Sequence, residues 1–286
     1  MQAGRARDIL KSSCLQQRDT TLTKISQTDP SKPQYHVRLR RQDAAPCALL
    51  PGNPARVDLI LSLLSNPRKI SSNREFLVGK GNYRGLELLV VSTGIGSPAA
   101  AIALEELANV GVRCAVRVGT TASIDESMEV GSVIIPVAAV RNEGTSSAYA
   151  PPSFPAIPDP ALLGLLISSS SSVATKTGVK VHVGLVSTDD AFYAEDEEVI
   201  SGLRRLKVTN LDMESSALFV VGWLKGIAVA SVLAVNGNLA KGEPFVEEEA
   251  IAAAEKAAAQ IALSGARLFV SRRSTFLSEE PTSAPR

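Results

Sequence analysis

The sequence predicts an α/β fold in which helices cover both faces of a mixed or parallel β-sheet. Short apolar runs alternate with helical segments along most of the chain, which is the pattern of strands covered by helices. The 286 residues are 45% hydrophobic and 21% charged, an ordinary globular composition. Chains of this length sometimes form two domains, but no internal repeat or linker divides this one. We therefore expect a single α/β domain.

The first half of the domain is predicted to begin with a strand, a loop and a helix. Residues 47–50 are an apolar run that ends in the turn PGNP, and residues 57–64 follow with helical spacing. A hairpin is expected next, because two apolar runs at 75–81 and 86–92 flank the turn sequence NYRG. The second run ends in STGIGSP, and residues 99–111 are rich in strong helix formers.

The second half of the domain continues the alternation. Apolar runs predict strands at residues 113–119, 131–140, 181–187 and 228–236. Helical spacing predicts helices at residues 162–173, 195–206, 213–226 and 246–270. Residues 143–160 are rich in Pro, Ser, Gly and Ala, and we expect a long loop there, which in a compact domain is usually functional or mobile.

The two ends of the chain differ from this pattern. Residues 1–34 are polar and aperiodic, and we expect a flexible N-terminal extension before a domain at 35–271. Residues 272–286 are expected to form a loose tail. The extension has no apolar segment typical of a secretory signal, and no apolar run approaches the roughly 20 residues of a membrane helix. We therefore expect a cytoplasmic protein.

Charge and cysteine content exclude several classes of function. A formal net charge of +1 gives no electrostatic reason to expect nucleic acid or an anionic membrane as a partner. The three cysteines, Cys14, Cys47 and Cys114, are far apart, and the histidines are His36 and His182 alone. This content excludes a disulfide framework and an ordinary zinc cluster, so we expect no metal.

Two segments that follow predicted strands have the composition of an anion site. PGNPAR contains Gly52 and Arg56, and RVGTT contains Arg117, Gly119 and Thr120. Glycine lets backbone N–H groups approach an oxyanion, arginine provides charged donors and threonine adds a hydroxyl. In open α/β sheets, ligands bind beyond the carboxyl ends of the strands. The alternative is a structural salt bridge for Arg117 and a surface position for Arg56.

The segment STGIGSP contains a weak match to a dinucleotide fingerprint. Gly94, Gly96 and Ala99 spell G-x-G-x-x-A between a strand and a helix. However, the next strand ends at Arg117 instead of an acidic residue that could bind a ribose, and Pro98 lies inside the turn. An NADP-type dehydrogenase is therefore a minor alternative.

Six segments together resemble the uridine phosphorylase and hexameric purine nucleoside phosphorylase family. They are, in order, GNPARVDLI, SSNREF, STGIGSPAAAIALEEL, RVGTTASI, DAFYAEDEE and LDMESSALF, and the resemblance covers roughly residues 34–270. It implies one α/β domain around a mixed, partly barrel-like sheet, assembled as dimers within a hexamer. It also implies a pentosyltransferase of nucleotide salvage that splits a ribonucleoside with inorganic phosphate as co-substrate and needs no cofactor.

The resemblance implies a role for each matching residue. Phosphate would be held by Gly52, Arg56, Arg117 and Thr120, with Arg74 reaching the phosphate of a neighbouring subunit. Ribose would be held by Thr93, Met213 and Glu214, with His36 reaching the 5′ end of the sugar across the interface. The base would contact Gly94, Phe192 and Asn236. Arg56, Arg117 and Glu214 would be the catalytic residues.

Simpler interpretations exist for some of these residues. Asp212 and Glu214 are also typical of the first turn of a helix, where acids are favourable. His36 is compatible with a surface position, and Phe192 with a place in the core.

Departures from the family pattern leave the base open. Asp196 and Glu198 stand where the uridine enzymes have a Gln and an Arg for uracil. DAFYAEDEE and NLAKG instead look like the archaeal purine and methylthioadenosine branch. Purine enzymes have a proton-donating Asp, and uridine enzymes an Arg, where this chain has Gly237, whereas Asn236 resembles the uridine side. Asp212 is a shorter acid than the Glu of the family. Uridine and inosine are the candidate substrates.

The arginine set favours phosphorolysis over its alternatives. A nucleosidase on the same fold would use water and a carboxylate base and would not need three arginines. A non-catalytic nucleoside-binding protein is the other alternative, favoured by Gly237. Serine hydrolase chemistry is excluded because the chain has no G-x-S-x-G motif. If the alignment is right, an Asp at position 237 is expected to raise adenosine cleavage; otherwise Asp190 or Asn238 are candidates for the base contact.

Overall fold

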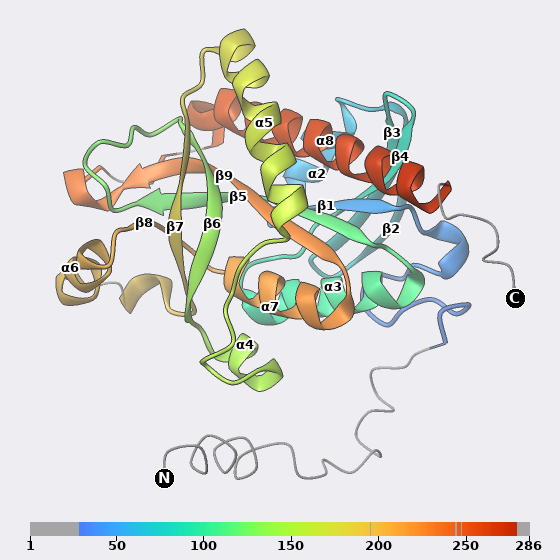
Figure 1. Ribbon diagram of the computed structural model, residues 1–286, viewed down its shortest axis with the longest axis horizontal. Coiled ribbons are helices and arrows are strands. Elements are labelled where there is room, and N and C mark those ends of the chain that lie inside the picture. The colour runs from blue at the N-terminus through green and yellow to red at the C-terminus, as the bar shows by residue number, and fades with distance from the viewer. Residues whose placement is uncertain (1–28, 195, 244, 247, 279–286) are drawn as a thin grey trace, which may run out of the picture.

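The computed structural model describes residues 29–194, 196–243, 245–246 and 248–278. Its centre is one nine-stranded sheet (Figure 1). The strands are β1 (Cys47–Pro51), β2 (Ser65–Asn73), β3 (Phe76–Tyr83), β4 (Leu86–Val91), β5 (Cys114–Ser123), β6 (Val133–Asn142), β7 (Val181–Asp189), β8 (Val208–Asp212) and β9 (Ala228–Asn238).

The sheet is mixed and partly closed. Its order is β2-β3-β4-β1-β5-β8-β7-β6-β9, and β9 returns to pair in parallel with β5 along its whole length. The strands β5, β8, β7, β6 and β9 therefore close into a barrel, which leaves no free edge on that side of the sheet. The prediction of a mixed, partly barrel-like sheet is confirmed.

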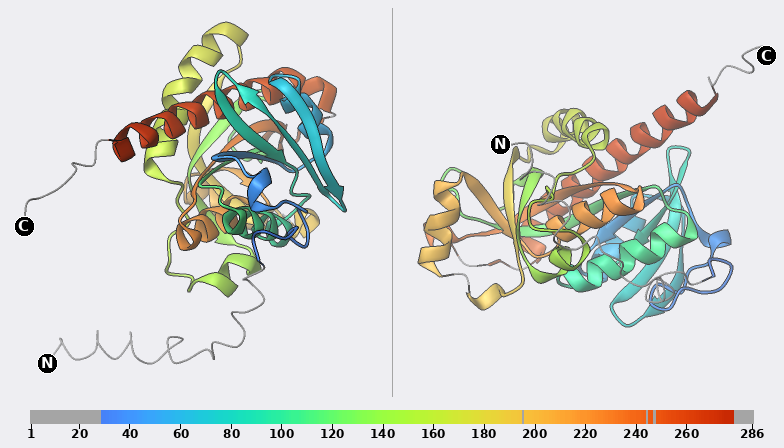
Figure 2. Two further views of the ribbon diagram at one scale, coloured as in Figure 1. Left: turned by 90° about the vertical axis from the view of Figure 1, so that its right-hand side faces the viewer. Right: turned by 60° about the horizontal axis from the view of Figure 1, so that its bottom comes forward.

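Helices cover both faces of the sheet. They are α2 (Ala55–Leu61), α3 (Ser97–Val110), α4 (Gly144–Tyr149), α5 (Pro160–Thr177), α6 (Glu197–Arg205), α7 (Ser215–Lys225) and α8 (Glu248–Ser278). The turned views show α8 crossing one face beside α5, whereas α3 and α7 lie together on the other face (Figure 2). Short 3-10 turns occur at η2 (Arg41–Asp43), η3 (Phe192–Ala194) and η4 (Leu239–Lys241).

Alternation along the central strands explains why both faces are covered. In β1, Leu49 packs into the core below α2, α5 and α8, whereas Leu50 packs into the core formed with α3 and α7. Neighbouring strands repeat the pattern, as in Leu88 and Leu89 of β4. Successive side chains of a strand point to opposite faces, so strands that are apolar throughout require helices on both sides.

Three elements of the structure were not predicted from the sequence: the strands β2 and β8 and the helix α4. β2 was not predicted because its residues are mostly exposed and polar, and the short β8 carries no long apolar run. The loop at 143–160 contains α4, whose first turn is capped by the Glu143 side chain, which accepts a hydrogen bond from the Ser146 N–H at 2.8 Å. Local patterns of hydrophobicity cannot reveal strands that are defined by their partners.

The predicted domain, residues 35–271, was too short at both ends. α8 continues to Ser278, so the loose tail predicted from residue 272 was wrong for 272–278, and residues 279–286 lie outside the described residues. Residues 1–28 of the predicted extension also lie outside them. Gln34 is fully buried, and its side chain accepts a hydrogen bond from Asn109 Nδ2 at 2.7 Å, so the prediction was wrong for this residue.

Candidate active site

A cleft of about 850 Å³ opens where the carboxyl ends of several strands meet. Gly52 follows β1, Gly94 follows β4, and β5 contributes Arg117 and Thr120. The opposite wall comes from the end of β8, the residues leading into α7, the end of β9 and the η3 turn. The anion-site segments of the sequence therefore lie in one cavity.

Arg56 forms part of the charged end of the cleft. It lies in the first turn of α2 and is 6% exposed. Its Nε donates a hydrogen bond to Glu255 Oε1 at 2.7 Å, and Glu255 is equally buried on α8. A buried charge needs such a partner, and the contact fixes the orientation of the guanidinium group.

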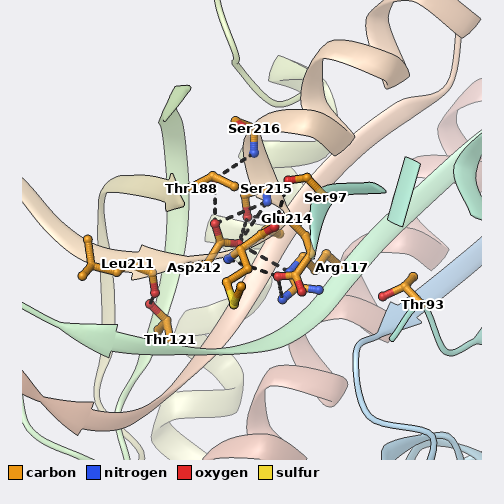
Figure 3. A network of polar contacts seen from close by, with 12 residues as sticks. Thr93, Ser97, Arg117, Thr121, Thr188, Leu211, Asp212, Glu214, Ser215 and Ser216 are labelled. Atoms are coloured by element: carbon orange, nitrogen blue, oxygen red, sulfur yellow. Dashed lines mark hydrogen bonds and ion pairs between the residues drawn. The ribbon is translucent and has the colours of Figure 1, made fainter. Parts of the chain in front are cut away.

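Arg117 lies opposite two acids from the other end of the chain. Its Nη2 donates to the Glu214 carboxylate, and its Nε lies 3.5 Å from Asp212 Oδ2 (Figure 3). The Arg117 side chain is 4% exposed, and its Nη1 has no hydrogen-bond partner in the described part of the chain. Its Nε also has no hydrogen-bond partner there, only the ionic contact with Asp212, and a buried guanidinium with unused donors is suited to an incoming oxyanion.

Two glycines make room for Arg117. A Cβ atom at Gly119 would lie 2.8 Å from Arg117 Nη2, because the guanidinium folds back over this residue. A Cβ atom at Gly52 would lie 3.3 Å from the carbonyl oxygen of Gly94 and 3.9 Å from Arg117 Nη1. Gly119 therefore leaves room for the Arg117 guanidinium and Gly52 for the Gly94 carbonyl oxygen, whereas the predicted approach of their N–H groups to an oxyanion stays a prediction.

Glu214 is buried between the STGIGSP loop and Arg117. Its Oε1 accepts a hydrogen bond from the Gly96 N–H at 2.8 Å, and its Oε2 accepts one from the Met213 N–H at 3.2 Å. Burial raises the pKa of Glu214, and the adjacent Asp212 raises it further, whereas Arg117 and the two N–H donors oppose the shift. Because the Gly96 N–H is directed at a carboxylate of the same chain, the segment does not serve as a dinucleotide fingerprint.

Asp212 is committed to the start of α7. Its carboxylate accepts hydrogen bonds from Thr188 Oγ1 at 2.7 Å and from Ser215 Oγ at 2.6 Å (Figure 3). It also accepts from the Ser215 N–H at 3.0 Å. Asp212 therefore lies at the end of β8, outside the first turn of α7, and from there it both holds Ser215 at the start of the helix and faces Arg117 in the cleft.

The other end of the cleft is neutral. It is formed by Thr121, Ala122, Phe192, Tyr193, Leu211, Asn236 and Phe245. The Thr121 hydroxyl donates to the carbonyl oxygen of Leu211 at 2.6 Å, so it is already used within the protein. Asn236 is the extra residue of a bulge between β5 and β9, where Thr121 pairs with Val235 and Ala122 with Gly237. A bulge redirects a side chain, and here Asn236 lines the cleft.

Known proteins resemble this chain in sequence and fold over most of its length. The model of the phosphorylase superfamily matches residues 46–268. The chain belongs to the phosphorylase superfamily. Uridine phosphorylase from Thermococcus kodakarensis is 37% identical over 223 residues, which cover 73% of this chain and 79% of that protein. Guanosine phosphorylase from Halorubrum lacusprofundi is 35% identical over 209 residues, which cover 73% of this chain and 85% of that protein.

A solved structure agrees with these relatives. Uridine phosphorylase from Vibrio fischeri superposes with a TM-score of 0.75 at 32% identity, covering 83% of this chain and 98% of that one. The prediction that this chain is a nucleoside phosphorylase, a pentosyltransferase, is thereby confirmed.

Most of the predicted site residues of this phosphorylase lie in the cleft. They are Gly52, Arg56, Gly94, Arg117, Thr120, Phe192, Met213, Glu214 and Asn236. Phe192 is 38% exposed, so it is not a core residue. The sequence therefore predicted the composition of the cavity well, although the individual roles of these residues stay predictions.

Three predicted site residues lie outside the cleft lining. Thr93 is fully buried, and its hydroxyl donates to the carbonyl oxygen of Gly94 at 3.1 Å. His36 Nδ1 lies 2.8 Å from Glu106 Oε1 on α3. Arg74 is exposed at the turn between β2 and β3, with a left-handed φ of 54°. The resemblance assigns His36 and Arg74 to the site of a neighbouring subunit, and this assignment stays a prediction.

The remaining candidates for the base contact do not reach the cleft either. The Asn238 amide donates to the carbonyl oxygens of Asp125 and Met128 at 2.9 and 2.7 Å. Asp190 accepts a hydrogen bond from the Gly144 N–H at 2.9 Å. Asp196, which stands where the uridine enzymes have a residue for uracil, instead caps α6 by accepting from the Val199 N–H at 2.9 Å.

Sequence reasoning missed several residues of the site, and four of them matter most to its geometry. Glu255 and Thr188 hold Arg56 and Asp212 in place, and Tyr193 and Phe245 line the neutral end. Glu255 carried a usable signal, because it is an acid among alanines in a helix that packs into the core. The other three carried none, because their roles depend on contacts between distant segments.

Proposed function

We propose that this chain catalyses the phosphorolysis of a ribonucleoside to free base and ribose 1-phosphate. The observation that carries the proposal is the pair of buried arginines in one cleft, Arg56 and Arg117, each oriented by a buried carboxylate. Gly52 and Thr120 line the same end of the cleft. This end offers two cations and close backbone approach, which suits a phosphate dianion.

The arrangement supports a simple sequence of bond changes. A phosphate oxygen forms a bond to the anomeric carbon of ribose as the bond from that carbon to the base nitrogen breaks. The electron pair goes to the base, which takes a proton from water. Positive charge develops on the sugar in the transition state, and the phosphate anion beside it is a stabilising partner. Glu214 lines the same cleft as both arginines, and in this proposal its carboxylate accepts hydrogen bonds from ribose hydroxyls.

The neutral end of the cleft favours a base that leaves without an acid. Gly237 has no side chain, and the described lining residues that we assign with Asn236 to this end, which are Thr121, Ala122, Phe192, Tyr193, Leu211 and Phe245, are uncharged. The Asn236 amide offers one donor and one acceptor, which match the adjacent N–H and C=O groups of uracil or a 6-oxopurine. We therefore favour uridine and inosine over adenosine as substrates.

We further propose that two subunits share each site within a hexamer built from dimers. Arg74 and His36 lie outside the cleft of their own chain, as expected if they complete the phosphate and ribose sites of a partner. A cytoplasmic place in nucleoside salvage belongs to the same proposal. Among the described residues, no helix has the length and apolarity to cross a membrane.

Product analysis with a nucleoside panel tests the proposed reaction. Uridine, inosine, guanosine and adenosine are each incubated with the purified protein, with and without phosphate. We expect base release only with phosphate or arsenate, and ribose 1-phosphate as the second product in phosphate. Equal release of base and free ribose without phosphate would establish a nucleosidase. Binding of nucleosides without any turnover would establish a non-catalytic protein.

A further inference from the structure

Phe245 occupies the space that a side chain at position 237 would need. A Cβ atom built on Gly237 would lie 3.2 Å from Phe245 Cδ1, 3.4 Å from its Cα and 3.5 Å from its Cε1. Contacts of 3.2 Å to a Cβ atom are tighter than ordinary van der Waals contact, so the neighbour must move. The glycine and the phenylalanine are therefore a matched pair.

The segment that carries Phe245 is fixed to the end of β9. The N–H of Asn238 donates to the carbonyl oxygen of Glu243 at 3.2 Å, and the N–H of Glu243 donates back at 2.9 Å. The Val246 N–H donates to the carbonyl oxygen of Asn236 at 2.9 Å. The fully buried Asn238 side chain anchors this turn to the carbonyl oxygens of Asp125 and Met128. Phe245 is thus held over Gly237 from both sides.

Phe245 belongs to a continuous aromatic surface, which we call the aromatic wall: Phe192, Tyr193 and Phe245. The ring centroids of Phe192 and Phe245 are 4.9 Å apart, and those of Phe192 and Tyr193 are 5.0 Å apart. All three line the cleft, and they are 38%, 99% and 39% exposed. Exposed aromatic faces in a cleft are suited to stacking with a planar ring. Any nucleobase can stack in this way, because every base has a π-face.

The charged side chains of the cleft belong to other segments. They are Arg56, Glu75, Arg117, Asp212 and Glu214. Around the aromatic wall, the uncharged polar groups of the described lining are the Asn236 amide and the exposed Tyr193 hydroxyl, because the Thr121 hydroxyl already donates to the Leu211 carbonyl oxygen. Among the described residues, the side chains that we assign to a ring in this place are therefore uncharged: the aromatic wall and the Asn236 amide.

We propose that Phe245 is the specificity-determining residue of the base pocket, and that it holds this place because residue 237 is glycine. This inference rests on the proposed function. The phenylalanine replaces a side-chain acid or cation at 237 with an aromatic surface, and it selects nucleosides whose base leaves without side-chain protonation. This replaces the expectation from the alignment that Gly237→Asp alone raises adenosine cleavage, because Phe245 occupies the space of the new side chain.

A double-mutant cycle on positions 237 and 245 tests the inference. The variants are Phe245→Ala, Gly237→Asp and the double variant, with Phe245→Leu to separate ring stacking from volume. Leu206→Ala is the matched control, since it also removes a large exposed apolar side chain, but from the end of α6 outside the cleft. KM for nucleoside, KM for phosphate and the ratio of uridine or inosine to adenosine turnover are measured for each protein.

We expect Phe245→Ala to raise the KM for uridine or inosine about tenfold or more, with the KM for phosphate unchanged. Phe245→Leu is expected to lose nearly as much, and the control nothing. Gly237→Asp is expected to lower turnover without gaining adenosine activity, whereas the double variant gains adenosine activity over both single variants. Folded variants with unchanged nucleoside KM, or effects of the two substitutions that simply add, would overturn the inference.

Failure of the proposed function gives a different result. If the wild-type protein turns over no nucleoside with phosphate, phosphorolysis is refuted, and the cycle is repeated by calorimetric binding of uracil and hypoxanthine. Weaker binding of free base to Phe245→Ala and Phe245→Leu would then still support the role of Phe245. Equal binding to all variants would refute it.

Discussion

At the scale of one residue, Arg117 shows how a buried charge in the sequence indicates a binding site. A charged side chain within an apolar strand predicted either an anion site or a structural ion pair, and the structure contains the ion pair inside the cleft. The sequence could not show that both acids come from residues 212–214, because the pairing of β5 with β8 brings them together. The position of Arg117 was predictable, and its partners were not.

Removal of Arg117 is expected to affect both activity and stability. Arg117→Ala should lower kcat/KM more than about tenfold, because one charge-assisted contact to a charged transition state is worth over ~1.4 kcal/mol. It should also lower the free energy of unfolding by roughly 3–5 kcal/mol, because two buried acids lose their cation. Steady-state kinetics and denaturant unfolding measure the two effects.

Two further variants separate these effects of Arg117. In Arg117→Ala/Glu214→Gln, one unpaired carboxylate is neutralised, so stability should partly return while activity does not. Arg204→Ala removes an exposed arginine that pairs with Glu126 at 2.7 Å on the surface, and it should change neither quantity by much. Wild-type kcat/KM in a folded Arg117→Ala protein would contradict the assignment of phosphate to this residue.

At the scale of elements, α8 has a second purpose besides covering the sheet. It carries Glu255 to Arg56 across 199 residues of sequence. The helix itself was predictable from its alanine-rich pattern, but its end at Ser278 and its contact with α2 were not, because both depend on packing. The unpredicted β2 and β8 are explained in the same way, since strands of this kind are defined by their neighbours.

Glu255→Gln is expected to weaken phosphate binding selectively. Arg56 keeps its charge but loses the ionic partner that orients its guanidinium group, so KM for phosphate should rise several-fold while KM for nucleoside stays unchanged. Glu126→Gln, on the surface, is the matched control. A rise in both KM values by the same factor would indicate general damage to the cleft and contradict a positioning role.

The buried Asp189 at the end of β7 is expected to make the stability of the protein depend on pH. Burial raises the pKa of Asp189, and the nearby Asp212 and Asp190 add to the shift, whereas hydrogen bonds from Asn142 and Ser187 oppose it. Because the folded state binds this proton more tightly than the unfolded state, the contribution of Asp189 to stability is complete below its unfolded pKa. It is lost as the pH rises through the raised pKa.

Asp189→Asn tests this dependence. The amide can still accept the hydrogen bond from Asn142 Nδ2 but never becomes charged. Relative to wild type, the Tm of the variant should therefore increase between about pH 4 and pH 7. A Tm difference that stays constant over this range would show that Asp189 does not titrate as described.

At the scale of the whole molecule, the resemblance to the nucleoside phosphorylase family predicted the partly closed sheet, which the periodicity of apolar residues could not. Alternating strands and helices predict a covered sheet, but closure of the barrel depends on the pairing of β5 with β9, which lie more than 100 residues apart. The pattern of local hydrophobicity contains no record of that pairing. The assembly of subunits is a further level, and the proposal of shared sites rests on His36 and Arg74.

Complementation of two inactive variants tests the shared site. Arg74→Ala and Glu214→Ala are prepared separately, shown to be folded and nearly inactive, and then unfolded and refolded together. Random pairing gives about half mixed dimers, each with one intact and one doubly damaged site, so activity should approach about a quarter of wild type. The parent variants refolded alone are the controls. If mixtures stay inactive despite measured subunit exchange, each site is built within one chain.

The contact between Arg117 and Glu214 has a consequence for the order in which substrates bind. In the proposed reaction, phosphate engages the arginine and ribose engages the glutamate, so each substrate takes over one member of an existing ion pair. The first to arrive must separate the pair, and the second finds its partner already released. Binding of the two substrates should then be positively cooperative within a single site, and thermodynamic linkage requires the same factor in both directions. Calorimetric titration of phosphate with and without a non-reactive nucleoside analogue would measure that factor, which Glu214→Gln should reduce toward one.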